Sequence, residues 1–363
     1  MNAGFTATGL PELSFGRGAF DRLSQQLCGF GRNVLVISDA YMRDHPSLLK
    51  DVSDALSKAE LSYEHLSALS KNTETSAEDI LENIDLSKFD CVISIGGGRA
   101  IDVGKLVSIE LPHIAVPTTA GTGAAMNGVI FGGENAHHEM QRTSLLPTIV
   151  LADPTFTDDM ERDDFAARAL GVFTLLLEAY ISPKSSVLSD ALVWSGLEAF
   201  ARGFVAGLDG NEVARGDVFY ASLMAGAGSG QAGFGLTHRL ACVIEQRSEL
   251  SYAQASATLS AEICDLQIQF LSDRLPDHAA MDKYALVGEL LAGRPFDACE
   301  ESYASLIGTL RRWVARLELP KFDLSQSELS SICEEVIQHW DMQILPIHLS
   351  EDDLLDSLLR RTS

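Results

Sequence analysis

Residues 89–105 read FDCVISIGGGRAIDVGK, a sequence that predicts a strand, a glycine-rich turn and a helix in succession. Its first half is apolar and rich in β-branched side chains, which predicts a buried strand. The three glycines that follow permit a tight turn, and the residues after them favour a helix. A helix that begins directly after such a turn presents free N–H groups and its positive dipole end, which favours phosphate binding. A tight turn without a ligand is the alternative interpretation.

Three further apolar runs flank this stretch: NVLVISD (33–39), IAVPTTAGTG (114–123) and TIVLADP (148–154). A helical pattern from Pro46 to about Glu60 separates the first of them from the glycine-rich stretch. Strands that alternate with helices are typical of βαβ units, so we predict a mostly parallel, Rossmann-like α/β sheet. Ligands of such sheets bind at the carboxyl ends of the strands, where these Gly- and Thr-containing loops lie.

The sequence pattern changes after Asp153-Pro154. Apolar residues now recur at helical spacing, as in ALGVFTLLLEAYI (169–181) and YASLIGTLRRWVARL (303–317). We therefore predict an α/β domain over residues 1–157 and an all-helical domain over residues 158–363.

Composition excludes several classes of function. The formal net charge is −24, which repels nucleic acid and anionic membranes. No run approaches the ~18 apolar residues of a transmembrane helix, and the N-terminus lacks the pattern of a secretory signal. The six cysteines are scattered without a CxxC pair, so a disulfide framework is not expected and we predict a cytoplasmic protein.

A second loop and a single carboxylate add to the phosphate-binding prediction. PTTAGTGA (117–124) places hydroxyls and glycines at a strand end, where they can bind a dinucleotide or simply form a polar loop. Asp39 ends the first strong strand. A carboxylate there accepts from a ribose 2′-hydroxyl and repels a 2′-phosphate, which favours NAD over NADP. The alternative for Asp39 is a cap of the following helix.

These motifs together resemble those of the iron-containing (group III) alcohol dehydrogenases. The resemblance rests on FGRG (15–18), GGGRAIDVGK (96–105), PTTAGTGA (117–124), LLLEAYIS (175–182), ASLMAGAG (221–228) and GLTHRLAC (235–242). It implies the dehydroquinate synthase-like architecture, an α/β dinucleotide-binding domain followed by an all-helical domain with the active site in the cleft. It also implies reversible alcohol–carbonyl redox chemistry with NAD(P) and a homodimer or higher homo-oligomer.

The resemblance assigns dinucleotide contacts to individual residues. In the family, the dinucleotide is held by the glycine turn (residues 96–98 here) and the Thr loop (residues 117–124 here). Lys105 lies one helical turn from Asp102. With Asp39, the cofactor-binding candidates are Gly96, Gly97, Gly98, Asp102, Lys105, Thr118, Thr119 and Thr122.

The metal site departs from the family pattern. Members bind a divalent metal through one Asp and three His. Counted from Glu178-Ala179-Tyr180, the Asp and the first His fall on Gly171 and Leu175, and the last His falls on Tyr252. His238 is the one match, with Cys242 four residues further on as a weak second candidate. We therefore expect no tightly bound metal.

Without a metal, another group must polarise the carbonyl, and His238 and Tyr252 are the candidates for a general acid. The leading hypothesis is a metal-independent, NAD-dependent oxidoreductase acting on a small alcohol or carbonyl compound. A non-catalytic dinucleotide-binding or regulatory protein is the second hypothesis. The third is another NAD-using reaction in the same fold, like that of the sugar-phosphate cyclases that make dehydroquinate, although these also need a metal.

Overall fold

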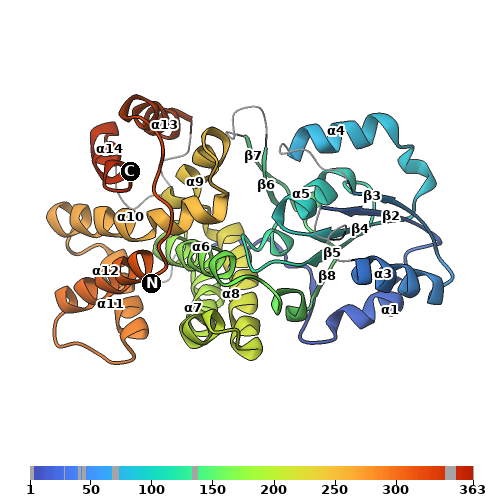
Figure 1. The fold of residues 1–363 in the computed structure, drawn as a ribbon, viewed down its shortest axis with the longest axis horizontal. Coiled ribbons are helices and arrows are strands. Elements are labelled where there is room, and N and C mark those ends of the chain that lie inside the picture. The colour runs from blue at the N-terminus through green and yellow to red at the C-terminus, as the bar shows by residue number, and fades with distance from the viewer. Residues whose placement is uncertain are drawn as a thin grey trace. The chain divides into compact units, whose positions relative to one another are not determined.

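The computed structural model describes residues 4–27, 29–39, 42, 46–67, 73–132, 138–339 and 349–362. The chain divides into two compact units. One is Thr8–Asp159, and the other, which is helical, is Met1–Ala7 together with Met160–Ser363. The first unit is built on a six-stranded sheet, and the second contains helices without a strand of more than one residue among its described residues. This confirms the predicted fold class (Figure 1).

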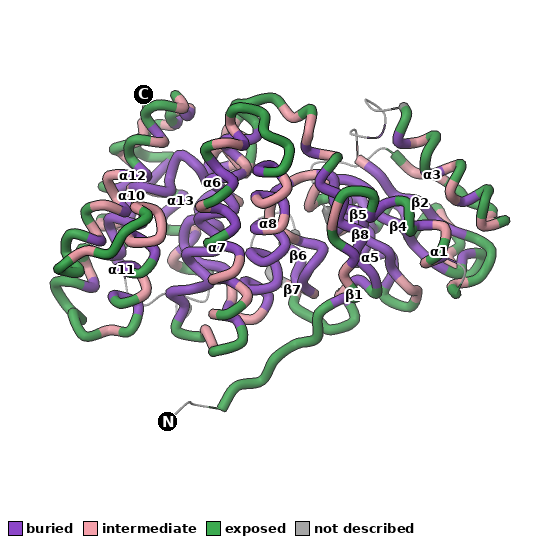
Figure 2. Tube along the Cα trace, turned by 90° about the horizontal axis from the view of Figure 1, so that it is seen from below, coloured by how far each residue is buried: buried purple, intermediate pink, exposed green. Residues whose placement is uncertain are grey.

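Every neighbouring pair of strands in the sheet is parallel, in the order β1-β8-β5-β4-β2-β3. The strands are β1 (Glu12–Phe15), β2 (Asn33–Ser38), β3 (Ser62–Leu66), β4 (Cys91–Gly96), β5 (His113–Pro117) and β8 (Ile149–Ala152). The sequence analysis anticipated β2, β4, β5 and β8 but not β1 or β3. Strands β4, β5 and β8 are buried throughout, as expected of a parallel sheet covered on both faces (Figure 2).

Helices cover both faces of this sheet. Residues of α1 (Leu23–Leu27) and α3 (Pro46–Lys58) pack with Val34 and Val36 of β2 on one face. Residues of α4 (Thr73–Asn83) and α5 (Gly98–Val107) pack with the alternate β2 residues on the other. A separate antiparallel pair, β6 (Val129–Gly132) and β7 (His138–Gln141), completes the unit. The unit therefore has three layers, with the sheet between two layers of helices. The loops that follow β2, β4 and β5 lie at the edge of the sheet where the parallel strands end.

Helix α6 forms the centre of the second unit and packs against α7, α8, α9, α10 and α11. The helices are α6 (Arg162–Ile181), α7 (Val187–Leu208), α8 (Glu212–Ala232), α9 (Leu236–Arg247), α10 (Tyr252–Arg274), α11 (Ala279–Ala292), α12 (Cys299–Arg316), α13 (Gln326–His339) and α14 (Glu351–Leu359). By length and composition, one described helix, α7, is apolar enough to cross a membrane. It packs closely against α6 and α8, as a core helix of a globular unit does.

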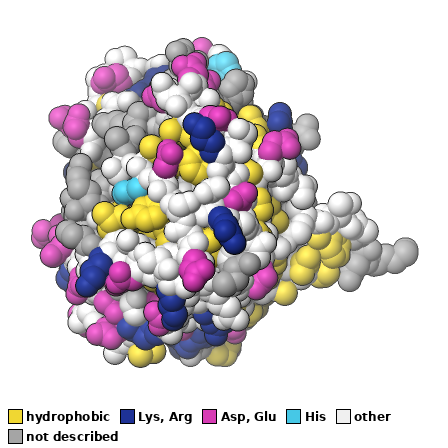
Figure 3. Space-filling view, turned by 90° about the vertical axis from the view of Figure 1, so that its right-hand side faces the viewer, with side chains coloured by type: hydrophobic (Ala, Val, Ile, Leu, Met, Phe, Trp, Pro, Cys, Tyr) yellow, Lys and Arg dark blue, Asp and Glu magenta, His cyan; other side chains and the backbone are white. Residues whose placement is uncertain are grey.

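Glycines allow this close packing. An ideal Cβ on Gly196 of α7 would lie 2.7 Å from Leu176 Cδ2, and one on Gly228 of α8 would overlap Val193. On the face shown in Figure 3, acidic and basic side chains are interspersed, so the net negative charge does not form one acidic patch there.

Candidate functional site

Three predicted loops follow adjacent strands of the sheet. Asp39 follows β2, the glycine turn follows β4, and the Thr loop follows β5. Because these strands are parallel neighbours, their carboxyl ends meet at one edge. The structure thus brings together the loops that the sequence analysis selected from segments almost 80 residues apart.

Asp39 contacts the glycine turn directly. Its Oδ2 accepts a hydrogen bond of 2.8 Å from the backbone N–H of Gly97. Gly96 has φ of 148°, and an ideal Cβ there would lie 2.5 Å from Asp39 Oδ2. Glycine is required at this position both for the backbone conformation and for the approach of the carboxylate. Asp39 is therefore held beside the turn that leads into α5.

The Thr loop packs against the same turn. An ideal Cβ on Gly98 would lie 2.8 Å from Thr122 Oγ1, and one on Gly97 would lie 3.5 Å from Thr119 Oγ1. Thr118 Oγ1 is buried and has no hydrogen-bond partner among the described residues. Helix α5 begins at Gly98, directly after the end of β4 at Gly96, so its N-terminus lies at the carboxyl edge of the sheet. An orphaned hydroxyl and a helix N-terminus beside close-packed glycines fit a phosphate-bearing dinucleotide.

Lys105 and Asp102 lie deeper in the unit. Lys105 Nζ donates to Asp102 Oδ1 at 2.8 Å, Asn127 Oδ1 at 3.3 Å and the Val129 carbonyl at 2.7 Å. Burial lowers the pKa of Lys105 and raises that of Asp102, while their attraction opposes both shifts. Because three acceptors use the three ammonium protons, any role of Lys105 in cofactor binding is through the position of α5.

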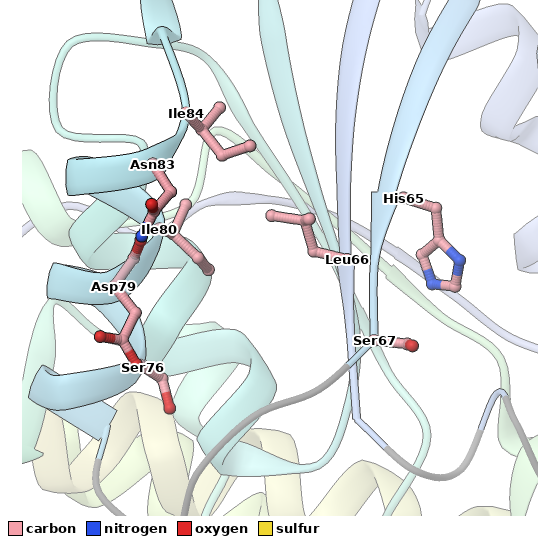
Figure 4. A pocket seen from close by; sticks show the side chains of 8 residues that line it. All are labelled: His65, Leu66, Ser67, Ser76, Asp79, Ile80, Asn83 and Ile84. Atoms are coloured by element: carbon pink, nitrogen blue, oxygen red, sulfur yellow. The ribbon is translucent and has the colours of Figure 1, made fainter.

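A cavity of about 280 Å³ lies beside the first of these loops, between β3 and α4 (Figure 4). His65 lines it, and its Nε2 lies 2.8 Å from the Oγ of Ser38, the residue before Asp39. Burial lowers the pKa of His65. Asp79 contributes a carboxylate, and the described lining contains no Lys or Arg. The sequence analysis did not find this cavity because it did not predict β3 or α4.

In the helical unit, Glu178 of α6 caps the start of α9. Its carboxylate accepts from the backbone N–H groups of Thr237 and His238. An ideal Cβ on Gly235 would lie 2.5 Å from Glu178 Cδ, so only glycine lets the helix end approach this closely. Burial raises the pKa of Glu178 to about 7 against the opposing hydrogen bonds. Glu178 therefore holds the helix turn that carries His238.

His238 has hydrogen-bonding partners at both ring nitrogens. Nδ1 lies 2.7 Å from the Tyr252 hydroxyl, and Nε2 lies 3.6 Å from Cys242 Sγ. A capping box between Ser251 and Gln254 fixes the start of α10 and hence the position of Tyr252. Burial, with a smaller effect of Arg239, lowers the pKa of His238 to about 3, so its ring is neutral. The structure thus brings together both predicted catalytic residues.

Two hydroxyls that the sequence analysis missed extend this cluster. Thr174 Oγ1 donates to the Gly171 carbonyl at 2.8 Å and lies 2.8 Å from Ser256 Oγ. Ser256 lies one helical turn further along α10 from Tyr252, and its hydroxyl lowers the pKa of Tyr252 against the larger effect of burial. The spacing of four residues from Tyr252 was a signal in the sequence, but Thr174 and Ser256 are 82 residues apart and only the fold pairs them.

These residues do not fit a divalent metal. Gly171 has no side chain to offer, Leu175 is a buried hydrocarbon, and both nitrogens of His238 have protein partners. Among the described residues, no group of three or more His, Cys, Asp or Glu is placed to hold a metal ion. A His and a thiol alone are too few ligands for a tight site.

The geometry is that of a parallel α/β unit with Gly- and Thr-containing loops at one sheet edge, followed by an all-helical unit with a His–Tyr–Cys cluster. Residues 11–154 match the family model for iron-containing alcohol dehydrogenase. Residues 165–361 match that for the C-terminal part of the same family. The chain belongs to the iron-containing alcohol dehydrogenase family, as the sequence motifs predicted, and is an alcohol dehydrogenase-like oxidoreductase by this membership.

Individual relatives agree over nearly the full length. Long-chain-alcohol dehydrogenase 1 of Geobacillus thermodenitrificans is 24% identical over 361 residues, which cover 90% of this chain and 89% of the relative. 1-Propanol dehydrogenase PduQ of Citrobacter freundii is 25% identical, with coverage of 92% and 89%. The crystal structure of a 1,3-propanediol oxidoreductase has a TM-score of 0.88 at 20% identity and covers 99% of this chain and 100% of that chain.

Proposed function

We propose that this protein interconverts a small alcohol and its aldehyde or ketone with a nicotinamide dinucleotide and without the divalent metal of its family. One observation carries the proposal. Of the four positions that correspond to metal ligands, two are Gly171 and Leu175 and the other two, His238 and Tyr252, hydrogen-bond each other, while the proposed dinucleotide loops keep their close packing and an orphaned hydroxyl. The relatives named for long-chain alcohols and 1-propanol support an alcohol as substrate.

The first unit holds the dinucleotide in this proposal, and the nicotinamide gives or takes the hydride. The first-turn amides of α5 and the glycine turn face the pyrophosphate, and Asp39 accepts from the ribose hydroxyls. Hydroxyl groups that can hydrogen-bond the dinucleotide come from Thr118, Thr119 and Thr122. Asp102 and Lys105 hold α5 in place.

Tyr252 supplies the proton that carbonyl reduction requires. Burial raises its pKa well above 10, so it is neutral and protonated at physiological pH. An alkoxide is a far stronger base than a phenolate, and donation from Tyr252 to the forming alkoxide is therefore downhill. His238, at 2.7 Å, hydrogen-bonds the phenol oxygen and holds it in position. In this arrangement, a positioned acid replaces a Lewis acid.

The test uses wild-type protein dialysed against EDTA. It is expected to contain far less than one metal ion per chain by elemental analysis and still to oxidise NADH with a short aldehyde. Tyr252→Phe is expected to lower kcat by roughly 100-fold or more while NADH affinity is kept, because the ring stays but its proton is gone. Full activity in Tyr252→Phe, or activity that returns only with added Fe²⁺ or Zn²⁺, would overturn the proposal. A wild type that binds NADH and reduces none of a panel of aldehydes would favour the non-catalytic alternative.

NADH is expected to bind more tightly than NADPH. A 2′-phosphate would meet the Asp39 carboxylate, and the adjacent cavity offers Asp79 and no described cation to neutralise it. Fluorescence titration of both reduced dinucleotides measures the two dissociation constants. Asp39→Asn is expected to lower the ratio of the NADPH dissociation constant to the NADH dissociation constant. A clear NADPH preference in the wild type would contradict this role of Asp39.

We also propose a cytoplasmic homodimer. The five described cysteines are free thiols, as a reducing compartment favours. Strand β1 lies at an edge of the sheet, and Leu10 and Phe15 beside it are 43% and 42% exposed. A sheet edge that carries exposed apolar side chains suits contact with a second copy through the α/β unit.

A further inference from the structure

Glu245 forms a second contact between α9 and Tyr252. Its Oε1 accepts a hydrogen bond of 3.1 Å from the backbone N–H of Tyr252, the first residue of α10. The phenol oxygen of Tyr252 lies 2.7 Å from Nδ1 of His238, which is also on α9. Seven residues, about two helical turns, separate His238 from Glu245, so both project from the same face of α9. One helix therefore holds both the backbone and the side chain of Tyr252.

The contact with Glu245 is separate from the capping box of α10. In that box, the Ser251 hydroxyl accepts from the backbone N–H of Gln254, and Gln254 Oε1 accepts from the backbone N–H of Ser251. Neither of these bonds involves α9 or the backbone N–H of Tyr252. Because the box already begins the helix, α10 does not need Glu245 in order to form. The bond from Glu245 instead links the start of α10 to α9.

The end of α9 that carries Glu245 is itself held in place. Arg247 Nη1 donates to Ser331 Oγ of α13 at 3.0 Å, and Nη2 of Arg247 forms an ion pair with Glu335 of the same helix. A carboxylate at the N-terminus of α10 is also favoured by the dipole of that helix. Glu245 therefore meets Tyr252 from a helix end that α13 keeps in position.

We propose that Glu245 is a positioning residue for Tyr252, the proton donor in carbonyl reduction. The inference rests on the proposed function, in which the phenol gives its proton to the forming alkoxide. Glu245 acts through the backbone of Tyr252, while His238 holds the phenol oxygen. Holding both ends limits the swing of the phenol about either contact. This matters for the rate, because a misplacement of about 1 Å can slow a reaction by roughly 100-fold.

The first measurement needs neither substrate nor dinucleotide. The full-length protein is labelled with ¹³C at the Cζ atoms of its tyrosines, and the Tyr252 signal is the one that Tyr252→Phe lacks. Glu245→Ala is expected to shift and broaden this signal, because the phenol is no longer held at one position beside His238. Glu245→Gln keeps an acceptor oxygen and is expected to leave the signal in place. Glu249→Ala, which removes an exposed carboxylate from the connection between α9 and α10, is the matched control. An unchanged signal in Glu245→Ala would overturn the inference.

The second measurement is the reduction of butyraldehyde by NADH. Glu245→Ala is expected to lower kcat by roughly 10-fold, while the KM for the aldehyde and the Kd for NADH stay within about twofold. Glu245→Gln is expected to keep most of the wild-type kcat. Adding Glu245→Ala to Tyr252→Phe is expected to lower kcat no further, because Glu245 acts only through the phenol. A further loss of kcat in the double variant would mean a merely structural role and would overturn the inference.

Glu245→Asp covers the case in which Glu245→Ala does not fold. It keeps the charge and moves the acceptor back by one methylene group, so kcat is expected to fall while the circular dichroism spectrum stays unchanged. A wild-type kcat in Glu245→Asp would count against the inference. Full activity in Tyr252→Phe would refute the proposed proton donor itself. Loss of activity in Tyr252→Phe together with a wild-type kcat in Glu245→Ala would refute only the role of Glu245.

Discussion

Gly97→Asp is expected to abolish NADH binding, raising Kd on the order of 100-fold or more, about 2.7 kcal/mol. Gly97 has φ of −76° and ψ of −175°, an extended conformation that any residue adopts. An ideal Cβ there meets Thr119 and Asp39 only at 3.5 Å and 3.6 Å. The variant should therefore fold normally. Its new carboxylate would lie at the start of α5, where the pyrophosphate is proposed to bind, and like charges there repel.

Gly97→Asn is the matched control, because its side chain has the same size and no charge. It is expected to weaken binding far less than Gly97→Asp does. Equal losses of NADH affinity in the two variants would mean that the size of the new side chain, and not its charge, weakens binding. Unchanged affinity in Gly97→Asp, measured by fluorescence titration with circular dichroism to check the fold, would mean that this turn does not bind phosphate.

The unfolding free energy of the Glu178→Gln variant, relative to that of the wild type, is expected to increase as pH rises. Burial raises the pKa of Glu178 from 4.5 to about 7, so the folded protein favours the protonated carboxyl. The stability from this preference is fully present below pH 4.5 and is lost as pH rises through 7. This difference in pKa corresponds to about 3 kcal/mol of unfolding free energy at pH 8. A Gln keeps an oxygen for the amides of α9 and does not ionise.

Urea unfolding of both proteins at pH 5 and pH 8 measures this effect. The difference in unfolding free energy between Glu178→Gln and the wild type is expected to change by about 2–3 kcal/mol over this range. Effects of His113 and His238, whose pKa values burial lowers to about 3, are common to both proteins and cancel. Glu198→Gln, exposed on α7, is the control and should show no such change. A pH-independent difference at Glu178 would mean that this carboxyl is ionised throughout.

Motifs with local physical causes were predictable from sequence. The run before Gly96 is apolar on both faces of the strand, and a glycine turn followed by a helix has few other conformations. The edge strands β1 and β3 were missed because they are short and half exposed, with no continuous apolar run. The cavity between β3 and α4 was missed with them.

Sequence alone was enough to assign the family, the parallel sheet with its Gly- and Thr-containing loops, and the helical second half. These features depend on residue type and on spacing along the chain. The contacts between side chains of different helices in the second unit became known only from the tertiary structure. Hydrogen bonds between Thr174 and Ser256 and between His238 and Tyr252 join different helices. Periodicity carries no information on such contacts, because it records which face a side chain occupies and not which partner the fold places opposite it.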